Sequence, residues 1–163
     1  MTRTHVLSKA DLRDRFDCGK DSLNLFLKKQ STQYQKKDLC QIFVRTNDDG
    51  YVIGYFTLSM SSIDLSVLPE KERKKLPRHP VPVVHLGRLA VCKSAQGKGI
   101  GRDLLMEVIE RTLRVSAEVS AFALEVYALD EEAISFYESY GFKSLCDDRK
   151  HMYISLKTLR KLI

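Results

Sequence analysis

A glycine-rich turn between a predicted strand and a predicted helix constrains this chain more than any other feature of its sequence. The segment runs from Leu89 through Gln96 to Gly101, with glycines at the alternate positions 97, 99 and 101. Glycines let the backbone turn tightly, so that several N–H groups can approach one anion. A helix that begins at the turn adds unpaired N–H groups and the positive end of its dipole. The pattern therefore predicts a socket for the phosphates of a nucleotide-like ligand.

Two other phosphate-binding patterns do not fit this turn. The dinucleotide-binding fingerprint is G-x-G-x-x-G followed by an acidic residue about 20 residues later, whereas the glycines here run G-x-G-x-G. The P-loop pattern G-x-x-x-x-G-K-[ST] does not occur in the chain. What remains is Q-x-x-G-x-G, from Gln96 to Gly101. These six residues alone leave open a glycine-rich turn that enters a helix without binding a ligand.

The sequence after the turn continues with helix and strand signals in a fixed order. Apolar residues with the spacing of one buried face predict a helix over 98–115, with Glu107 among the charged residues of the opposite face. The apolar run 121–128 predicts a buried strand. Asp130 is predicted to cap the next helix and Gly141 to end it. This helix ends in the motif F-Y-x-x-x-G-F, from Phe136 to Phe142.

In the turn and in this second motif, over about residues 80–145, the chain resembles the GNAT superfamily of acetyl-CoA-dependent N-acetyltransferases. The resemblance implies one α/β (α+β) domain over residues 1–163, an acyl-CoA N-acyltransferase fold in which helices flank a mixed central sheet. It implies that acetyl-CoA is the acetyl donor, with its pantetheine arm on the central strand and its pyrophosphate in the turn. The residues that it assigns to acetyl-CoA are Leu89, Ala90, Val91, Gln96, Gly97, Lys98, Gly99, Ile100, Gly101 and Arg102.

Composition agrees with one globular domain and excludes several other classes. A chain of 163 residues is long enough for a proper core. It has no apolar run of about 18 residues and no apolar N-terminal signal region, so we expect neither a membrane span nor export. Its four cysteines and four histidines are scattered. This spacing favours reduced thiols in the cytoplasm and predicts no metal site.

The first half of the sequence predicts a short strand, a helix and a hairpin before the central strand. The first strand is expected at 4–8 and a helix capped by Ser22 at 23–37. The turn Asn47–Gly50 predicts a hairpin over 41–63. A short helix or ordered loop is expected over 69–76, and three prolines then favour extended chain into the central strand. That strand is predicted at 83–91 and the last strand of the sheet at 151–156.

Tyr137, in the F-Y pair of the second motif, is the candidate general acid. A phenol has a pKa near 10, so it is protonated at neutral pH and can donate to a departing thiolate. The resemblance places the family's catalytic tyrosine at this position. The alternative is that Tyr137 only packs against the core, three and four residues after Ile134 and Ala133. Tyr140 is a nearby competitor, but its place before Gly141 better suits packing or the surface.

A general base is not obvious from the sequence. Glu125 and His85 lie on predicted strands near the site, yet each is more simply explained as a structural residue. A free α-amino group has a pKa near 8, so a base is not strictly required to provide neutral amine. Many GNAT enzymes have Asn where this chain has Asp130, which puts a cofactor contact from that side chain in doubt.

The charge of the chain points to a polyanionic partner. Its formal net charge is +6 and its pI is about 9.1. Lysines gather on the first predicted helix, and a second basic group, which includes Arg78, precedes the central strand. Each group is equally well explained as a solvated face. Arg88, on the central strand itself, is harder to explain by solvation.

A narrower resemblance, to the GNAT toxins of bacterial type II toxin–antitoxin modules, covers nearly the whole chain. It rests on the segments Phe16–Gly19, Leu23–Leu27, Gly54–Ser59, Leu76–Pro82 and Leu86–Val91. Members of this family acetylate the α-amino group of aminoacyl-tRNA and so arrest translation. The implied partners are a ribbon-helix-helix antitoxin, operator DNA bound through the complex, and a possible second copy in a homodimer.

The basic groups provide what a tRNA surface needs, because phosphate contacts dominate such binding. The residues predicted to face tRNA are Lys28, Lys29, Lys36, Arg78 and Arg88. Two alternatives stay open. One is an ordinary GNAT enzyme that acts on a protein N-terminus, a lysine or a small amine. The other is a non-catalytic module that binds acyl-CoA or nucleic acid, which the intact turn and Tyr137 disfavour.

Overall fold

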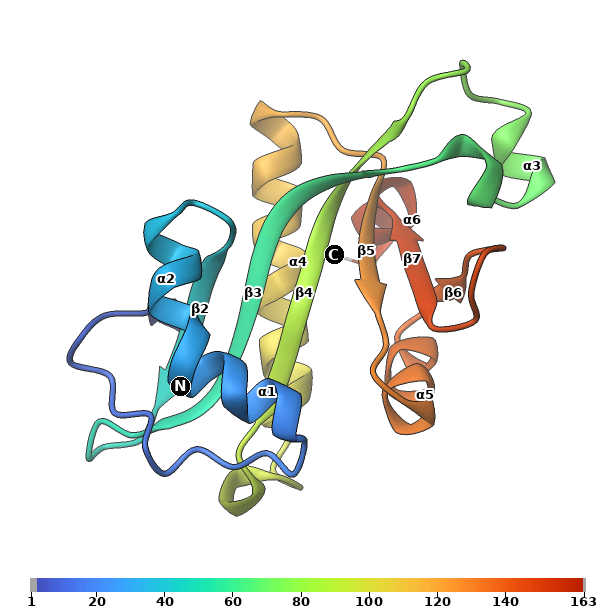
Figure 1. Ribbon diagram of the computed structural model, residues 1–163. Helices are drawn as coiled ribbons and strands as arrows, with labels where there is room; N and C mark the ends of the chain where they lie inside the picture. The colour runs from blue at the N-terminus through green and yellow to red at the C-terminus, as the bar shows by residue number, and fades with distance from the viewer. Residues whose placement is uncertain (1–2, 163) are drawn as a thin grey trace. The chain divides into compact units, whose positions relative to one another are not determined.

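The computed structural model describes residues 3–162, which contain the strands of a mixed sheet together with helices, as predicted (Figure 1). The seven strands follow the order β1-β2-β3-β4-β5-β7-β6. The chain divides into two compact units, one of residues up to Ser59 with Gly87–Val108, the other of Met60–Leu86 with the chain from Ile109 onward. Strands β3 (Val52–Ile63) and β4 (Val81–Val91) and helix α4 (Ile100–Glu118) run through both units. One domain over 1–163 stays a prediction.

The first unit is built on an antiparallel meander. Strand β1 (His5–Val6) pairs with β2 (Gln41–Thr46), which pairs with β3 in the predicted hairpin. The Asn47 Oδ1 atom accepts hydrogen bonds from the N–H groups of Asp49 and Tyr51, both at 3.0 Å, and Gly50 has a φ of 88°. An Asn side chain that bonds the backbone two residues ahead is the expected device for such a turn. The hairpin prediction is therefore confirmed.

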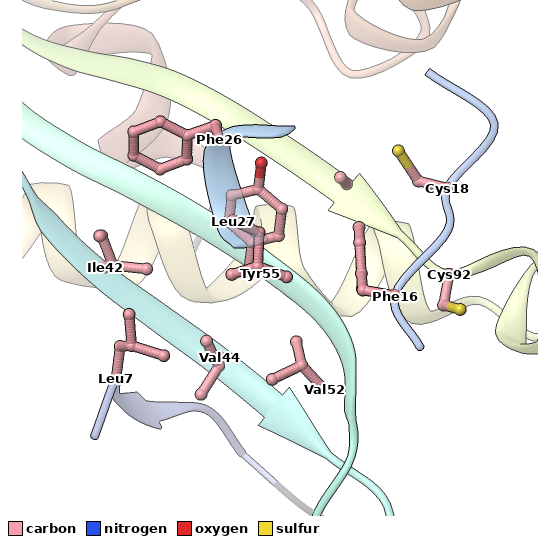
Figure 2. Close-up of a cluster of buried hydrophobic side chains, with 11 residues drawn as sticks. Leu7, Phe16, Cys18, Phe26, Leu27, Ile42, Val44, Val52, Tyr55 and Cys92 are labelled. Atoms are coloured by element: carbon pink, nitrogen blue, oxygen red, sulfur yellow. The ribbon is translucent and has the colours of Figure 1, made fainter. Parts of the chain in front are cut away.

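The helical segment of the first unit packs on one face of these strands (Figure 2). Phe26 and Leu27 lie against Ile42 of β2 and Tyr55 of β3, and all four side chains are almost fully buried. The ring centroids of Phe26 and Tyr55 are 6.2 Å apart, and the buried Tyr55 hydroxyl donates to the carbonyl of Leu23 at 2.7 Å. Burial of these large side chains stabilises this unit.

The predicted helix over 23–37 is confirmed as an unbroken helical segment, but it consists of three pieces rather than one regular α-helix. These are α1 (Asp21–Leu25), the π-helical turn η1 (Phe26–Gln30) and α2 (Ser31–Lys36). Ser22 lies inside α1 rather than capping it, so that prediction is wrong. The Ser31 hydroxyl donates to the Leu27 carbonyl at 2.6 Å and accepts from Arg13 Nη1 at 2.9 Å. A serine that bonds the preceding turn competes with the regular helical ladder, which explains the widened turn.

Helix α4 begins where the glycine-rich turn ends, and its first half packs closely on β3. A Cβ atom at Gly54 would lie 3.0 Å from Leu104 Cδ1, 3.4 Å from the Ala90 carbonyl and 3.6 Å from Ile100 Cγ2. Only glycine allows this approach without a shift of its neighbours. Glu107, predicted on the solvent face, is buried, because the Thr4 N–H donates to it at 3.0 Å and the Thr4 hydroxyl bonds its other oxygen.

The second unit contains the end of the sheet and the remaining helices. Strand β5 (Ala123–Tyr127) is parallel to β4 and antiparallel to β7 (His151–Ser155). Helix α5 (Glu131–Ser139) is capped by Asp130, whose Oδ1 accepts from the Ala133 N–H at 2.9 Å. Gly141, with a φ of 95°, follows the helix, so both predicted ends of α5 are confirmed.

The short elements of the second unit lie outside the strong sequence signals. The prediction of a short helix over 69–76 corresponds to α3 (Glu70–Arg73), which follows the 3-10 turn η2 (Leu65–Val67). The two-residue strand β6 (Lys143–Ser144) and the C-terminal helix α6 (Leu156–Lys161) were not predicted. Within residues 3–162, no helix combines the length and the apolar composition that crossing a membrane requires. All four cysteines are free.

Candidate active site

The glycine-rich turn of the first unit has the geometry of an anion socket. It follows β4 and the 3-10 turn η3 (Lys93–Ala95), and it leads directly into α4. Gly97 and Gly99 have φ values of 78° and 80°, a conformation that other residues rarely adopt. Both glycines are exposed, and a Cβ built on either would meet no atom within 4 Å. The glycines therefore turn the backbone and leave open space over it, as a bound phosphate would need.

Hydrogen bonds from two directions hold this turn in place. The Gln96 side chain donates through Nε2 to the Val91 carbonyl at 2.9 Å and to the Cys18 carbonyl at 3.2 Å. The Lys93 N–H donates to the Asp17 carbonyl at 2.8 Å. Gln96 was predicted to bind acetyl-CoA, but its amide nitrogen is used within the protein. Its side chain therefore shapes the socket, and a ligand would meet the backbone of the turn.

The segment Phe16–Gly19, singled out in the sequence without a role, supports the socket. Asp17 Oδ1 accepts from the Gly19 N–H at 2.9 Å and from Asn24 Nδ2 at 3.0 Å. These hydrogen bonds, with the nearby Lys93 ammonium, lower the pKa of Asp17. Asp17 and Asn24 were not among the predicted site residues. The signal that could have indicated them is the presence of two polar residues, Asp17 and Asn24, among the apolar residues of this segment.

The other predicted acetyl-CoA residues of the first unit divide by exposure. Ala90 and Ile100 are buried, so only their backbone groups can face a ligand. Leu89, Val91 and Gly101 are half-buried, whereas Lys98 and Arg102 are exposed at the start of α4. Cations at this place can reach phosphate oxygens.

Arg88 of β4 has its guanidinium on aromatic rings of the first unit. Its Cζ lies 3.6 Å from the ring centroid of Phe26 and 5.4 Å from that of Tyr34. Within residues 3–162 the guanidinium forms neither an ion pair nor a hydrogen bond. Stacking holds the group in one place while its N–H donors stay free for an anion.

The remaining predicted tRNA residues are exposed. Lys28 and Lys29 lie on η1 and Lys36 lies at the end of α2, all on the helical segment that also carries Phe26. Arg78 precedes β4 and belongs to the second unit. Their exposure allows contact with a large anionic partner, but no structural feature distinguishes them from solvated residues.

Tyr137 lies on α5 in the second unit and is almost fully buried. Its ring packs against Phe136 and Phe142, with ring centroids 5.2 Å apart in both pairs. Burial raises the pKa of Tyr137 above its usual range, so the phenol keeps its proton at neutral pH. Tyr140 is half-buried and packs edge-on against Phe136 at 5.2 Å. Burial fits both a packing role and an acid, so the catalytic role of Tyr137 stays a prediction.

A second polar cluster of this unit joins three strands. Glu125 of β5 lies with Oε1 2.8 Å from His85 Nδ1 and with Oε2 2.5 Å from His151 Nε2. His151 Nδ1 lies 2.9 Å from an oxygen of Asp147, and the Tyr127 ring stacks on the His151 ring at 4.1 Å. Burial tends to raise the pKa of Glu125, but the hydrogen bonds from both histidines outweigh it and lower the pKa.

The sequence indicated Glu125 and His85 separately but not their contact, and it did not indicate His151. Only the register of the sheet brings them together, since His85 pairs with Glu125 and Tyr127 with His151. Within residues 3–162, no three His, Cys, Asp or Glu side chains are arranged to hold a metal ion. The cluster is therefore organised by hydrogen bonds.

Comparison with known proteins assigns the chain to a family. Residues 9–142 match the model of the Acetyltransferase (GNAT) family. The chain belongs to the GNAT acetyltransferases. This confirms the predicted fold and enzyme class, and it agrees with the open glycine-rich turn ahead of α4.

The similarity to characterised relatives extends over nearly the whole GNAT chain. It is 34% identical to a tRNA-acetylating toxin of Mycobacterium tuberculosis, over 96% of this chain and 93% of the relative. It is 28% identical to a probable toxin TacT of Sinorhizobium fredii, over 93% and 88% of the two chains. The predicted relationship to GNAT toxins is confirmed.

Solved structures of the toxin AtaT have the same fold. AtaT complexed with acetyl-methionyl-tRNAfMet superimposes with a TM-score of 0.91 and 31% identity, covering 99% of both chains. A tyrosine-to-phenylalanine mutant of AtaT was solved bound to acetyl-CoA and the C-terminus of the antitoxin AtaR. It superimposes with a TM-score of 0.83 and 28% identity, covering 98% of this chain and 96% of AtaT. The AtaT–AtaR complex bound to DNA superimposes with a TM-score of 0.80 and 29% identity, covering 98% of both chains.

Proposed function

We propose that this GNAT acetyltransferase is the toxin of a type II toxin–antitoxin system. It transfers the acetyl group of acetyl-CoA to the α-amino group of an aminoacyl-tRNA, and the blocked amine cannot form a peptide bond. The observation that carries the proposal is the end-to-end similarity to a tRNA-acetylating toxin, at 34% identity over 96% of the chain. AtaT, solved with an acetylated methionyl-tRNA, is similar over 99% of the chain.

The first unit provides the groups that would bind acetyl-CoA. The exposed backbone of Gly97, Lys98 and Gly99 would donate N–H groups to the pyrophosphate, and the start of α4 adds the positive end of its dipole. The Lys98 and Arg102 side chains would add charge-assisted hydrogen bonds. Main-chain groups of Leu89–Val91 would bind the pantetheine arm. The match of this chain to the GNAT family and the solved acetyl-CoA complex of an AtaT mutant support this assignment.

The second unit provides the candidate acid. The acceptor nitrogen attacks the thioester carbonyl carbon, the C–S bond breaks, and the departing sulfur takes a proton. Tyr137 would supply that proton, because its raised pKa keeps the phenol protonated until a strong base forms beside it.

The tRNA surface is proposed on the helical segment Asp21–Lys36 and on the stacked guanidinium of Arg88. Lys28, Lys29 and Lys36 are exposed there, and Arg78 adds a cation before β4. Free cations on a protein of net charge +6 would release counterions from tRNA phosphates on binding. The aminoacyl-tRNA would therefore be held mainly through its phosphate backbone.

The proposed protein partner is an antitoxin encoded beside this chain. AtaT is solved with the C-terminus of AtaR and, as a complex, with DNA. By analogy we propose a ribbon-helix-helix antitoxin whose complex with this chain binds operator DNA. A homodimer of the toxin is part of the same proposal.

The test is translation in a purified bacterial system. Addition of this protein with acetyl-CoA should stop synthesis, and fresh aminoacyl-tRNA added after the protein is removed should restore it. Protein without acetyl-CoA is the control and should have no effect. Unchanged synthesis in the presence of both would contradict the proposed function and favour a protein or small-amine acceptor.

A further inference from the structure

Four side chains of the second unit form one line of hydrogen bonds, here called the histidine–carboxylate chain: Asp147, His151, Glu125 and His85. Consecutive members are 2.9, 2.5 and 2.8 Å apart. The middle members are enclosed, since the side chains of His151 and Glu125 are each 5% exposed. The ends are accessible, at 35% for Asp147 and 29% for His85. Such a line connects the protein interior with one open imidazole.

The hydrogen-bond partners determine which atoms carry protons. Ionised carboxylates only accept hydrogen bonds, and both nitrogens of His151 face carboxylate oxygens. A proton on each nitrogen would let both donate, and His151 would then be an imidazolium that compensates the charge of Glu125. The lowered pKa of Glu125 agrees with an ionised carboxylate at its position.

His85 is the member with an unused nitrogen. Its Nδ1 donates to Glu125, and this places the lone pair of the neutral ring on Nε2. Within residues 3–162, nothing forms a hydrogen bond with Nε2. A carboxylate that fixes the tautomer of a histidine and leaves the other nitrogen free is the arrangement found in general-base catalysis.

A purely structural role explains the histidine–carboxylate chain less well. The three strands already pair through their backbones and pack through apolar side chains around Val83 and Ala123. Burying a carboxylate and an imidazolium costs desolvation that an apolar pair at the same place would avoid. Neither a free Nε2 nor an exposed ring is needed to join strands. These features are what a proton acceptor requires.

We propose that His85 is the general base that removes a proton from the ammonium group of the acceptor, with Glu125 and His151 as positioning residues. This rests on the proposed function. His85 Nε2 takes one proton from the –NH3+ group, and the resulting amine attacks the thioester carbon. As the C–S bond breaks, Tyr137 donates its proton to the departing thiolate. The nitrogen of the addition product then loses a second proton, and this proton returns Tyr137 to its neutral form. The proton on His85 leaves to solvent through its exposed side.

The place of His85 in the fold fits this role. It lies on β4 in the second unit, which also contains Tyr137, the proposed acid. Compensation of Glu125 by His151 has a chemical consequence. A lone buried carboxylate would hold His85 as an imidazolium, which cannot accept a proton, whereas a compensated one orients the neutral ring.

The other titratable groups near the histidine–carboxylate chain lie on β5, β7, α3 and the loop before β7. Tyr127 of β5 stacks on His151, and Tyr153 of β7 lies opposite Glu125 in the sheet and donates to Glu72 of α3 at 2.6 Å. Burial raises the pKa of both tyrosines, so they stay neutral. Asp148 lies next to Asp147 and acts on Tyr127.

The test compares pH–rate profiles of single variants with charged tRNA as acceptor. His85→Asn keeps a donor for Glu125 near the Nδ1 position but has no base. We expect kcat to fall about 100-fold or more at neutral pH, with unchanged acetyl-CoA affinity and an approach to the wild-type rate as pH rises and the amine deprotonates by itself. Glu125→Gln should keep part of the activity and move the acidic limb of the profile. Tyr153→Phe, on the same face of the sheet, should leave the profile unchanged.

A second measurement does not depend on the acceptor. Nitrogen-15 NMR of labelled histidines should show His85 as a neutral ring protonated on Nδ1 at neutral pH, and His151 with both nitrogens protonated. A ring of His85 protonated on Nε2, or an acidic limb that survives in His85→Asn, would overturn the inference. Absence of acetyl transfer to charged tRNA by the wild-type protein would instead contradict the proposed function, and the NMR result would still decide the state of His85.

Discussion

At the scale of single residues, Tyr137 combines burial with an available proton. Replacing it by phenylalanine removes only the hydroxyl, so the packing against Phe136 and Phe142 should stay intact. We expect Tyr137→Phe to lower kcat about 100-fold or more, with little change in acetyl-CoA affinity or stability. Steady-state kinetics and calorimetry check both parts. Tyr140→Phe, three residues away on the chain, is the control and should keep full activity.

Substitution of Gly99 tests whether the glycine-rich turn binds the phosphates of acetyl-CoA. Gly99→Glu adds a strained backbone and a negative charge at an exposed position with a φ of 80°. We expect acetyl-CoA affinity to fall by about tenfold or more, equivalent to about 1.4 kcal/mol. Gly50→Glu is a matched control, because Gly50 has a φ of 88° but lies in the β2–β3 turn. It should lose stability without losing affinity. Equal affinities of Gly99→Glu and wild type would mean that the phosphates bind elsewhere.

Glu125 gives the protein a defined response to acid. Its pKa is lower in the folded protein than the value of 4.5 expected for a free Glu. The folded state therefore binds the proton less well, so this group stabilises the fold above pH 4.5 and loses that effect as pH falls through the folded pKa. We expect Glu125→Gln to lower the free energy of unfolding by about 3 kcal/mol at pH 7. The difference from wild type should shrink in acid, as urea unfolding at several pH values can show.

Sequence patterns predicted backbone geometry where one local motif determines it, whereas the ligands of these residues stay predictions. The left-handed glycines at 97 and 99 and the cap at Asp130 follow from neighbouring residues and were correctly placed. The use of the Gln96 side chain inside the protein was not predictable in this way. Its partner Cys18 is 78 residues away in the chain. The contact of Glu125 with His151 depends likewise on the register of two strands.

At the scale of elements, the contact of α4 with β3 depends on Gly54. Gly54→Ala would place a methyl group 3.0 Å from Leu104 Cδ1, and this fully buried side chain would have to move by a few tenths of an ångström. We expect a loss of about 1–2 kcal/mol in the free energy of unfolding. Ser62→Ala, at an exposed position of the same strand, should change it by no more than about 0.5 kcal/mol. Equal stabilities would show that α4 can shift to accept the methyl group.

Long periodic elements were predictable and short or interrupted ones were not. The apolar spacing of α4 and the alternation of the β2–β3 hairpin extend over enough residues to be distinctive. The π-helical turn Phe26–Gln30 preserves most of the apolar spacing of a regular helix, so the break at Ser31 is not visible in the pattern. The burial of Glu107 comes from Thr4, which is 103 residues away.

At the scale of the whole molecule, the net charge of +6 predicts salt-dependent tRNA binding. We expect charge reversal at both Lys28 and Lys36 to raise the KM for tRNA and to reduce its dependence on salt, because phosphate contacts are lost. Reversal at Lys157 and Arg160, two exposed cations of α6, changes the net charge equally and is the control. The same KM in both double variants would assign the effect to overall charge and remove the first helical segment from the tRNA surface.

The family was predictable from two short motifs, whereas the acceptor was not predictable from physical chemistry. Backbone geometry explains why Gln96–Gly101 should hold phosphates, so acetyl-CoA follows once the family is known. Nothing in charge or spacing distinguishes an aminoacyl-tRNA from another amine-bearing polyanion. That part depends on similarity to the tRNA-acetylating toxins along 96% of the chain.

Transfer of labelled acetyl from acetyl-CoA to total bacterial tRNA tests the central claim most directly. Three substrates are compared: charged tRNA, the same tRNA after deacylation, and charged tRNA whose α-amino groups are already blocked. The account predicts label on the first alone, released with the amino acid by mild base, and an initial rate of labelling about 100-fold lower, or lower still, with Tyr137→Phe. Label on deacylated or blocked tRNA, or on none of the three while acetyl-CoA is bound, would contradict it.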